Sequence, residues 1–312
     1  AIQRAALPGI TAGYEAAFGQ VWHDHTTARL TLPAPQLVAM DYNIGVKGEG
    51  FEYIFGRGKG LVSIRYNGVQ LLDDTVRPNF WRAPTNNDEG CAEPFASAFW
   101  KTAGLYARCD NLTAEAKGEF VTVRANYTLP DGQTLPIDFA IDGAGRCDIT
   151  MTWQGEHTEL PEFGLLFPLR RELTEVSYLG LGPRETTADR TAGGKMGVWN
   201  YNVRQDFAQY TPVYPQECGS RTGVYSATVT GSIPGIGFAG DGMTFSALPY
   251  TPHELENARH LYELPRDDSK TVVRCAAFQR GVGGDNSWGA KPHADTCFAV
   301  EKGTSFRFMI QK

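Results

Sequence analysis

The feature that most constrains the fold is an alternation of apolar and polar residues over residues 121–153, VTVRANYTLPDGQTLPIDFAIDGAGRCDITMTW. Apolar residues recur at every second position, which is the period of strands that bury one face. The turn signals PDG at residues 130–132 and DGAG at residues 142–145 divide the run into three segments. We therefore predict an antiparallel meander here.

The same pattern extends to both sides of the meander. Residues 51–72 contain a glycine-rich turn at 56–60 and the hairpin signal Asn67-Gly68, whose residues tolerate positive φ. Strands are predicted over residues 121–129, 146–153, 223–230, 242–248, 271–279 and 304–311. The chain is therefore expected to be all-β, with antiparallel sheets.

Helix signals are few and short. Residues 93–107, EPFASAFWKTAGLYA, can place Phe95 and Phe99 on one helix face. In residues 251–258, Thr251 is the expected N-cap, Pro252 lies in the first turn and Glu254 completes a capping box. Both patterns predict short surface helices.

Composition excludes several classes of partner. The 312 residues carry a formal net charge of −6, and Lys and Arg are scattered rather than clustered, which argues against a nucleic-acid partner. No apolar run reaches the ~20 residues of a membrane span, and the N-terminus lacks the order of charges and apolar residues found in signal peptides. We expect no membrane partner. The first residue is not Met, so a fragment or a processed product is expected.

The cysteines indicate neither a metal site nor a disulfide framework. The six residues are far apart in the sequence, with no CxxC pair and no His at metal-ligand spacing. Free thiols in a reducing compartment, the cytoplasm, are expected.

Residues 30–50, LTLPAPQLVAMDYNIGVKGEG, carry two prolines between patterned segments, which is typical of a connector. We place a domain boundary near residues 34–48. Because about 200 to 250 residues make one large β unit, a small piece before this boundary is consistent with the chain length.

The densest group of polar residues is NFWRAPTNNDEG, residues 79–90. Adjacent polar groups before a glycine predict a loop whose side chains bond nearby backbone amides, with Gly90 as a hinge. The alternative is a structural turn buried at the edge of a sheet.

Four motifs occur in order at large spacings: FWRAPTNNDEG (80–90), YLGLGPRETTADR (178–190), YTPVYPQECGSR (210–221) and GVGGDNSWG (281–289). Together they make the chain resemble the C-terminal domain of the large bacterial β-galactosidases of glycoside hydrolase family 2, called the small chain in split enzymes. The resemblance covers residues 35–312. Residues 12–22, AGYEAAFGQVW, resemble the last strand of the immunoglobulin-like domain that precedes it, so residues 1–34 are expected to be a remnant of that domain.

The resemblance implies a large antiparallel β-supersandwich, shared with galactose mutarotases, and a role in hydrolysing β-galactosides. The family's two catalytic Glu residues, and its magnesium and sodium ligands, lie on a central barrel domain that these 312 residues lack. The chain is therefore expected to hold no catalytic residue, metal or cofactor. Its expected partners are the catalytic barrel portion and a galactoside substrate, within a homo-oligomeric enzyme.

Trp288 is the leading candidate for sugar contact. An indole in a glycine-rich loop can place its face on the C–H face of a pyranose, while Asp285, Asn286 and Ser287 bond hydroxyls or hold the loop. From the residues alone, a core or loop-anchoring role for this Trp is the commoner one. The resemblance favours stacking on the sugar at the mouth of the pocket.

The resemblance also makes residues 79–90 the anchor of a mobile loop that borders the active site. Asn86, Asn87 and Asp88 are the expected anchor residues and Gly90 the expected hinge. Asn86 stands where the family usually has Asp. This sequence also departs from the family near Thr187, where an aromatic is usual, and at Cys218, where Asn is common.

Charged residues of alternating sign predict a structural cluster of ion pairs and hydrogen bonds. Its expected members are Arg184, Glu185, Asp189, Arg190 and Arg221.

Two other functions are consistent with parts of the sequence. A free-standing carbohydrate-binding module would bind sugar without any partner. An aldose 1-epimerase would need a His acid facing a carboxylate base, for which His157 with Glu156, Glu159 or Glu162 supplies the residue types, and His253 is a further candidate.

Overall fold

The computed structural model describes residues 20, 32–210, 214–286 and 289–312. The chain divides into two compact units, Ala1–Leu30 and Thr31–Lys312, and the second contains all the elements given below. Residues 12–22, where an immunoglobulin-like strand is expected, lie outside the described part except for Gln20. The division into residues 1–34 and 35–312 stays a prediction.

The first part of this unit is a five-stranded antiparallel sheet with its strands in chain order. The strands are β1 (Gln36–Ala39), β2 (Asn43–Gly48), β3 (Phe51–Gly56), β4 (Gly60–Tyr66) and β5 (Val69–Gln70). The predicted Asn67-Gly68 hairpin is confirmed, with φ values of 51° and 79°. Within residues 30–50, which were expected to form a connector, residues 36–39 and 43–48 are instead strands β1 and β2, and Ile44 and Val46 are buried in the core.

A second antiparallel sheet of 12 strands forms most of the molecule. Its main path runs β14-β13-β15-β16-β19-β10-β9-β8-β7, while β12 pairs with β17 and β6 beside it. The bounds are β6 (Arg77–Asn79), β7 (Arg108–Lys117), β8 (Phe120–Thr128), β9 (Thr134–Asp142), β10 (Cys147–Thr152), β12 (Glu162–Arg170), β13 (Leu173–Gly182), β14 (Lys195–Asn202), β15 (Arg221–Gly231), β16 (Ile236–Leu248), β17 (Lys270–Gln279) and β19 (Ser305–Gln311). Strands β11 (Thr158–Leu160) and β18 (Phe298–Val300) form a separate pair.

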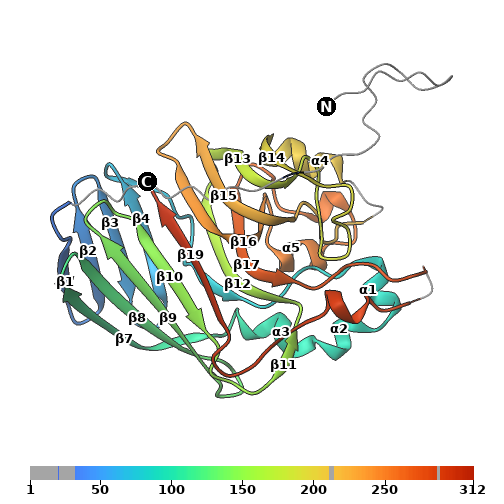
Figure 1. Ribbon diagram of the computed structural model, residues 1–312, viewed down its shortest axis with the longest axis horizontal. Helices are drawn as coiled ribbons and strands as arrows, with labels where there is room; N and C mark the ends of the chain where they lie inside the picture. Colours follow the sequence, from blue (N-terminus) through green and yellow to red (C-terminus); the bar gives the residue numbers. More distant parts are fainter. Residues whose placement is uncertain (1–19, 21–31, 211–213, 287–288) are drawn as a thin grey trace. The chain divides into compact units, whose positions relative to one another are not determined.

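The predicted meander is strands β8, β9 and β10, which pair antiparallel in chain order. In β8, every second residue from Val121 to Tyr127 is buried, as the alternation predicts. The strands predicted toward the C-terminus are also confirmed, as parts of β15, β16, β17 and β19 (Figure 1). The fold is therefore all-β and antiparallel, as expected.

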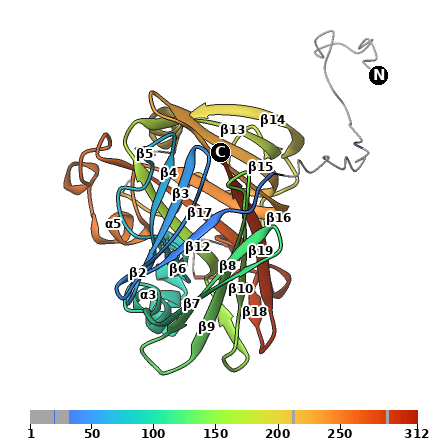
Figure 2. The ribbon, with the colours of Figure 1, turned by 90° about the vertical axis from the view of Figure 1, so that its left-hand side faces the viewer.

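The two large sheets share one apolar core. Phe55 of β3 and Phe139 of β9 meet edge to face, with ring centroids 5.0 Å apart. Tyr53 donates a hydrogen bond of 2.7 Å to the carbonyl of Gly145, in the turn between β9 and β10. Figure 2 shows the blue strands β2 to β4 beside the green strands β8 to β10. The arrangement is a sandwich.

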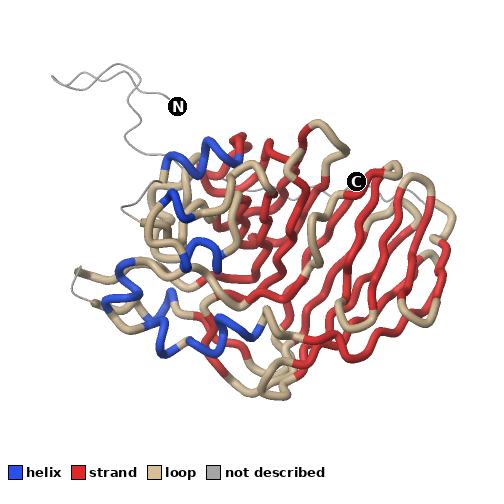
Figure 3. Tube along the Cα trace, turned by 180° about the vertical axis from the view of Figure 1, so that it is seen from behind, coloured by secondary structure: helices blue, strands red, loops and turns tan. Residues whose placement is uncertain are grey.

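Short helices lie beside one end of the strands (Figure 3). They are α1 (Asn86–Gly90), α2 (Glu93–Ala96), α3 (Ala98–Ala103), α4 (Val203–Gln209) and α5 (Pro252–Asn257), with 3-10 turns at Leu261–Glu263 and Ala294–Thr296. The capping box of α5 is confirmed, with both Thr251 and Glu254 bonding as predicted. None of the described helices has the length and apolar character needed to cross a membrane.

The single helix predicted over residues 93–107 is wrong in detail. The helix is interrupted at Ser97, which is the C-cap of α2 and the N-cap of α3. Phe95 is consequently 86% exposed, whereas Phe99 packs against the core beside Trp100. The two aromatic rings therefore do not form one buried helix face.

Candidate functional site

Helix α1 brings the first motif to a fixed position. Thr85 caps the helix, and the Asp88 carboxylate accepts hydrogen bonds from the Thr85 backbone N–H (2.7 Å) and hydroxyl (2.8 Å). Within the loop predicted over residues 79–90, residues 86–90 instead form a short helix, although the predicted bonding of side chains to nearby backbone N–H groups is present at Thr85 and Asp88.

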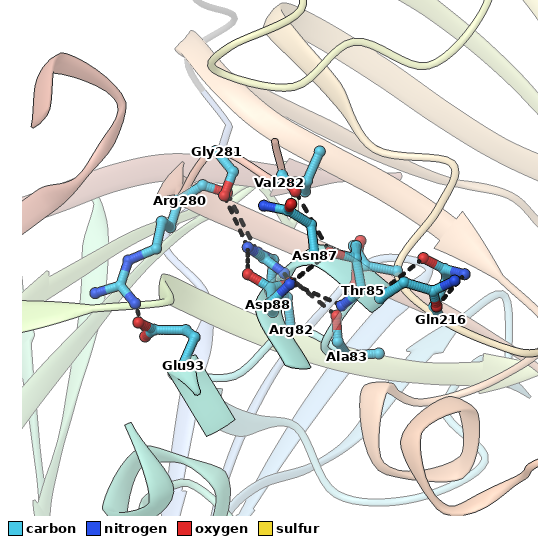
Figure 4. A network of polar contacts seen from close by, with 12 residues as sticks. Arg82, Ala83, Thr85, Asn87, Asp88, Glu93, Gln216, Arg280, Gly281 and Val282 are labelled. Carbon is cyan, nitrogen blue, oxygen red and sulfur yellow. Dashed lines mark hydrogen bonds and ion pairs between the residues drawn. The ribbon is translucent and has the colours of Figure 1, made fainter. Parts of the chain in front are cut away.

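Arg82 and Asp88 form a buried, two-bond ion pair. Arg82 donates to the two Asp88 oxygens over 2.6 and 2.9 Å, and the side chains are only 3% and 1% exposed (Figure 4). Burial alone raises the pKa of the Asp88 carboxyl, but Arg82 and Thr85 outweigh burial and lower that pKa. Asp88 is thus held as a carboxylate.

The same guanidinium joins the first motif to the fourth. Arg82 also donates to the backbone carbonyls of Arg280 (3.2 Å) and Gly281 (2.8 Å). We call Arg82, Thr85 and Asp88 the Arg82 anchor. It connects segments that are almost 200 residues apart in the sequence.

Two further contacts tie helix α1 to the end of the fourth motif. Asn87 donates from Nδ2 to the carbonyl of Ala290 over 3.0 Å. The backbones of Gly90 and Gly289 touch: a Cβ on Gly289, where φ is +86°, would stand 2.3 Å from the Gly90 carbonyl oxygen. Asn86 exchanges hydrogen bonds with Gln216 of the third motif. We call α1 together with residues 281–286, 289 and 290 the rim.

Trp288 and Ser287 lie outside the described residues. Asp285 and Asn286, next to them in the chain, are exposed. Asp285 bonds His293 over 2.7 Å, and this bond, together with the charge of Asp285, raises the pKa of His293. The sequence reasoning missed His293, whose partner Asp285 is eight residues away in the chain.

An open polar hollow of about 530 Å³ lies beside the rim. Its lining includes carboxylates of Asp189, Asp285 and Asp295 and the side chains of Arg190 and His293. The carboxylates accept hydrogen bonds, the Arg190 guanidinium donates them and the His293 ring can do either, so this lining can bond hydroxyl groups such as those of a sugar. The hollow therefore offers both acceptors and donors of hydrogen bonds to a polar ligand.

The predicted polar cluster forms in part. Arg190 pairs with Glu185 over 2.7 Å, and Asp189 accepts from the Thr187 hydroxyl (2.6 Å) and the Gly283 N–H (2.7 Å). Asp189 thereby joins the second motif to the fourth. Arg184 is exposed and does not take part in these bonds.

Arg221 belongs to a different group. It is fully buried, donates to both oxygens of Asp206 over 2.7 Å, and stacks 4.2 Å from the centre of the Tyr201 ring. Its partner Asp206 is on α4, an element that the sequence reasoning missed. Arg221 therefore holds α4 against the sheet.

A third buried ionic group, which we call the Arg274 cluster, joins strands β12, β16 and β17 to the third motif. Arg274 donates to Glu162 over 2.8 Å, to Ser246 over 3.0 Å and to Glu217. The remaining members are Asn79, Ser220 and Gln279. The sequence reasoning missed this cluster, although a lone Arg within the apolar strand TVVRCAAF is a signal, since a buried charge needs a partner.

Of the Glu residues considered with His157 for an epimerase, Glu156 lines the same open hollow as His157, whereas Glu159 and Glu162 have partners elsewhere. His157 is exposed, Glu159 pairs with Arg280 over 3.2 Å, and Glu162 is buried against Arg274. His253 bonds the backbone carbonyl of Lys101 over 2.6 Å. Among the described residues, no group of three or more His, Cys, Asp or Glu side chains has an arrangement that could hold a metal ion.

Comparison with known proteins identifies the family. A sequence profile described as the beta galactosidase small chain matches residues 47–310. The chain belongs to the β-galactosidase small-chain family.

Relatives of this small-chain family differ in how much else they contain. The β-galactosidase of Lactobacillus delbrueckii subsp. bulgaricus is 38% identical over 89% of this chain, which spans only 28% of that protein. The β-galactosidase small subunit of Latilactobacillus sakei is 32% identical over 80% of this chain, and the match covers 89% of that subunit. A solved structure, the galactose 1-epimerase from Lactobacillus acidophilus NCFM, aligns over 89% of this chain and 97% of its own, with 7% identity and a TM-score of 0.46.

Proposed function

We propose that this chain completes the sugar-binding pocket of a β-galactosidase and positions the substrate, while the catalytic carboxylates lie on another portion of the enzyme. Family membership supports the activity of the whole enzyme. The chain spans less than a third of several β-galactosidases, and a relative of nearly its own length is called a small subunit. Both facts support a catalytic partner outside these residues.

The observation that carries the proposal is the joining of the first and fourth motifs. The contact between Gly90 and Gly289, and the bond from Asn87 to Ala290, make one rim from two distant segments. Trp288 is next to Gly289 in the chain, and Gly289 is part of this rim. The polar hollow beside Asp285 supplies groups for sugar hydroxyls.

In this role, Trp288 stacks on the apolar face of the galactose, and Asp285 and Asn286 bond hydroxyls or hold the loop. The whole enzyme would hydrolyse terminal β-galactosides with retention, using two carboxyl groups about 5 Å apart on the partner. Magnesium and sodium would also be held by that partner. The proposed setting is a cytoplasmic homo-oligomer, which suits the six cysteines, all of them free.

The test is reconstitution of the chain with the catalytic portion of the enzyme. Trp288→Ala should lower kcat/KM for a β-galactoside about tenfold or more, equivalent to about 1.4 kcal/mol of transition-state stabilisation. Trp288→Phe should restore part of the loss, and Tyr262→Ala, at a residue 81% exposed on a different turn, should leave the rate unchanged. Full activity of the Trp288→Ala enzyme would refute the assigned role.

The isolated chain separates this proposal from its rivals. We expect neither galactoside hydrolysis nor strong binding, because one open wall buries little of a ligand's surface. Strong binding by calorimetry would favour a carbohydrate-binding module. Faster exchange of galactose anomers in proton NMR would favour an epimerase.

A further inference from the structure

An open hollow of about 520 Å³ lies beside helix α2. Pro84, Pro94 and Phe95 supply its apolar lining, and Phe95 is 86% exposed. Proline and phenylalanine rings offer apolar area to a partner with little side-chain freedom to lose on binding. The described part of the chain leaves this area uncovered, and exposed apolar patches of this kind are typical of interaction sites.

A second hollow, of about 250 Å³, extends along helix α3 and shares Lys101 with the first. Its apolar lining includes Trp100 and Leu105. Leu105 is 40% exposed, and Tyr106, which follows it in the chain, is 66% exposed. We call the two hollows, together with Phe95, Leu105 and Tyr106, the α2–α3 face.

The charged side chains that line the first hollow are already paired within the chain. Lys101 forms an ion pair with Glu256 over 2.8 Å, and Arg259 forms one with Glu89 over 3.3 Å. These pairs leave no excess charge to attract a charged ligand. Paired charges around an apolar centre are instead the arrangement of a protein interface, in which a polar rim surrounds an apolar core.

The α2–α3 face begins at the rim. Glu89 belongs to α1 and therefore to the rim, and it also lines the hollow that contains Phe95. Helix α2 follows α1 directly in the chain and lies beside it (Figure 1). A polypeptide that rests on α1 therefore meets the α2–α3 face next.

We propose that the α2–α3 face is a docking surface for the catalytic portion of the enzyme, whose apolar side chains enter the two hollows. The proposal rests on the function proposed above, which places the catalytic carboxylates of that portion across the pocket from the rim. Because the rim and the α2–α3 face share Glu89, one continuous surface serves both purposes. Phe95 is the expected centre of the contact, since buried aromatic side chains carry much of the binding energy of an interface.

The size of the relatives favours this occupant. The chain spans less than a third of several β-galactosidases, so under the proposed function most of the enzyme lies outside these residues. A stable interface takes about 20 to 30 residues on each side, which is more than the rim contains. Docking therefore needs further surface next to the rim, and the α2–α3 face supplies it.

The decisive variant is Phe95→Asp, which places a charge in the apolar hollow. It should weaken binding of the chain to the separately produced catalytic portion about tenfold or more, as measured by calorimetry. Because Phe95 is exposed, the melting temperature of the isolated chain should not change. Phe95→Leu keeps an apolar side chain and should retain most of the affinity.

Tyr42→Asp is the matched control. Tyr42 is also 86% exposed, but it lies in the turn between β1 and β2, on the opposite side of the molecule in Figure 1. Its substitution should leave the affinity unchanged. Parent affinity in Phe95→Asp, or an equal loss in Tyr42→Asp, would overturn the proposal.

Sedimentation of the isolated chain tests a second copy as the occupant. We expect Phe95→Asp to leave its oligomeric state unchanged. If the parent chain forms a dimer that Phe95→Asp dissociates, while binding to the catalytic portion stays the same, then the face joins two copies and the proposal is wrong.

Activity separates this proposal from the proposed function. When the chain is added in saturating amounts, Phe95→Asp should regain the kcat/KM of the parent, because only docking is weakened. Trp288→Ala should bind the catalytic portion like the parent yet stay slow at every concentration. Weak binding of Phe95→Asp together with full activity of Trp288→Ala would support the docking face and refute the role of Trp288, and the reverse result would refute the docking face alone.

Discussion

The contact between β3 and β9 and the Arg274 cluster are both fully buried, yet they are held in different ways. Phe55 and Phe139 need only fit each other's shape, since apolar packing is not directional. Arg274 instead depends on named partners at hydrogen-bond distance, Glu162 and Ser246 among them. The apolar contact tolerates small changes in size, whereas the polar cluster tolerates almost no loss of a partner.

The difference shows what the polar residues do in this fold. A buried ion pair adds little net stability compared with apolar residues of the same size, because removing charges from water is costly. The Arg82 anchor and the Arg274 cluster nevertheless fix where separate segments meet. We infer that their main contribution is positional.

The largest expected effect comes from removing the central charge of the polar cluster. Arg274→Ala should lower the free energy of unfolding by about 3–5 kcal/mol, because it leaves two carboxyl groups without their cation. The matched control is Arg65→Ala, since Arg65 forms an exposed pair with Glu52 and should lose at most about 1 kcal/mol. Denaturant titration measures both. Equal losses would show that burial of the pair does not matter.

A smaller loss is expected when the charge is kept but the geometry is changed. Arg82→Lys preserves a cation beside Asp88 but cannot donate to two carboxylate oxygens and two carbonyls together, so we expect a loss of about 1.5–3 kcal/mol. Thermal or denaturant unfolding will measure it. If Arg82→Lys does not change the free energy of unfolding, then the positive charge alone is enough to hold the anchor.

The apolar core that contains the contact between Phe55 and Phe139 should respond more mildly to a small change in side-chain size. Ile137→Val in β9 removes one buried methylene group and should cost about 0.5–1.5 kcal/mol, with no change in the positions of the polar residues. Denaturant unfolding gives the loss, and Arg65→Ala again serves as the surface control. A loss above that of Arg82→Lys would reverse the comparison.

The last prediction concerns how the free energy of unfolding changes at acid pH. Since the pKa of Asp88 is lowered in the fold, its contribution is present above its unfolded pKa of about 3.9 and is lost as the pH falls through the lower, folded value. The stability difference between the parent and Asp88→Asn should therefore shrink below about pH 4. Unfolding at a series of acid pH values measures this. A difference that stays constant would mean that Asp88 does not titrate with the fold.

The features that the sequence predicted share a local cause. Alternation in residues 121–153, the Asn67-Gly68 turn and the Thr251 capping box each depend on residues that are close in the chain. The four motifs were also recognised, although their mutual contacts were not.

What the sequence did not predict depends on distant partners. Helix α1 was expected to be a loop, because its stability comes from Asp88 bonding both Thr85 and the distant Arg82 guanidinium. Glu162 and Arg274 are more than 100 residues apart, so nothing local in the sequence pairs them. The role of Trp288 remains a prediction.

The bare backbones of Gly90 and Gly289 have a mechanical consequence. Because no side chain separates the two backbones, they are in direct contact. A shift of either backbone is therefore expected to displace the other. A displacement of Gly289 is therefore expected to reach the end of α1 and, through the ion pair between Asp88 and Arg82, the buried side of the sheet. In this way the close contact of two glycines couples two segments that are distant in the sequence.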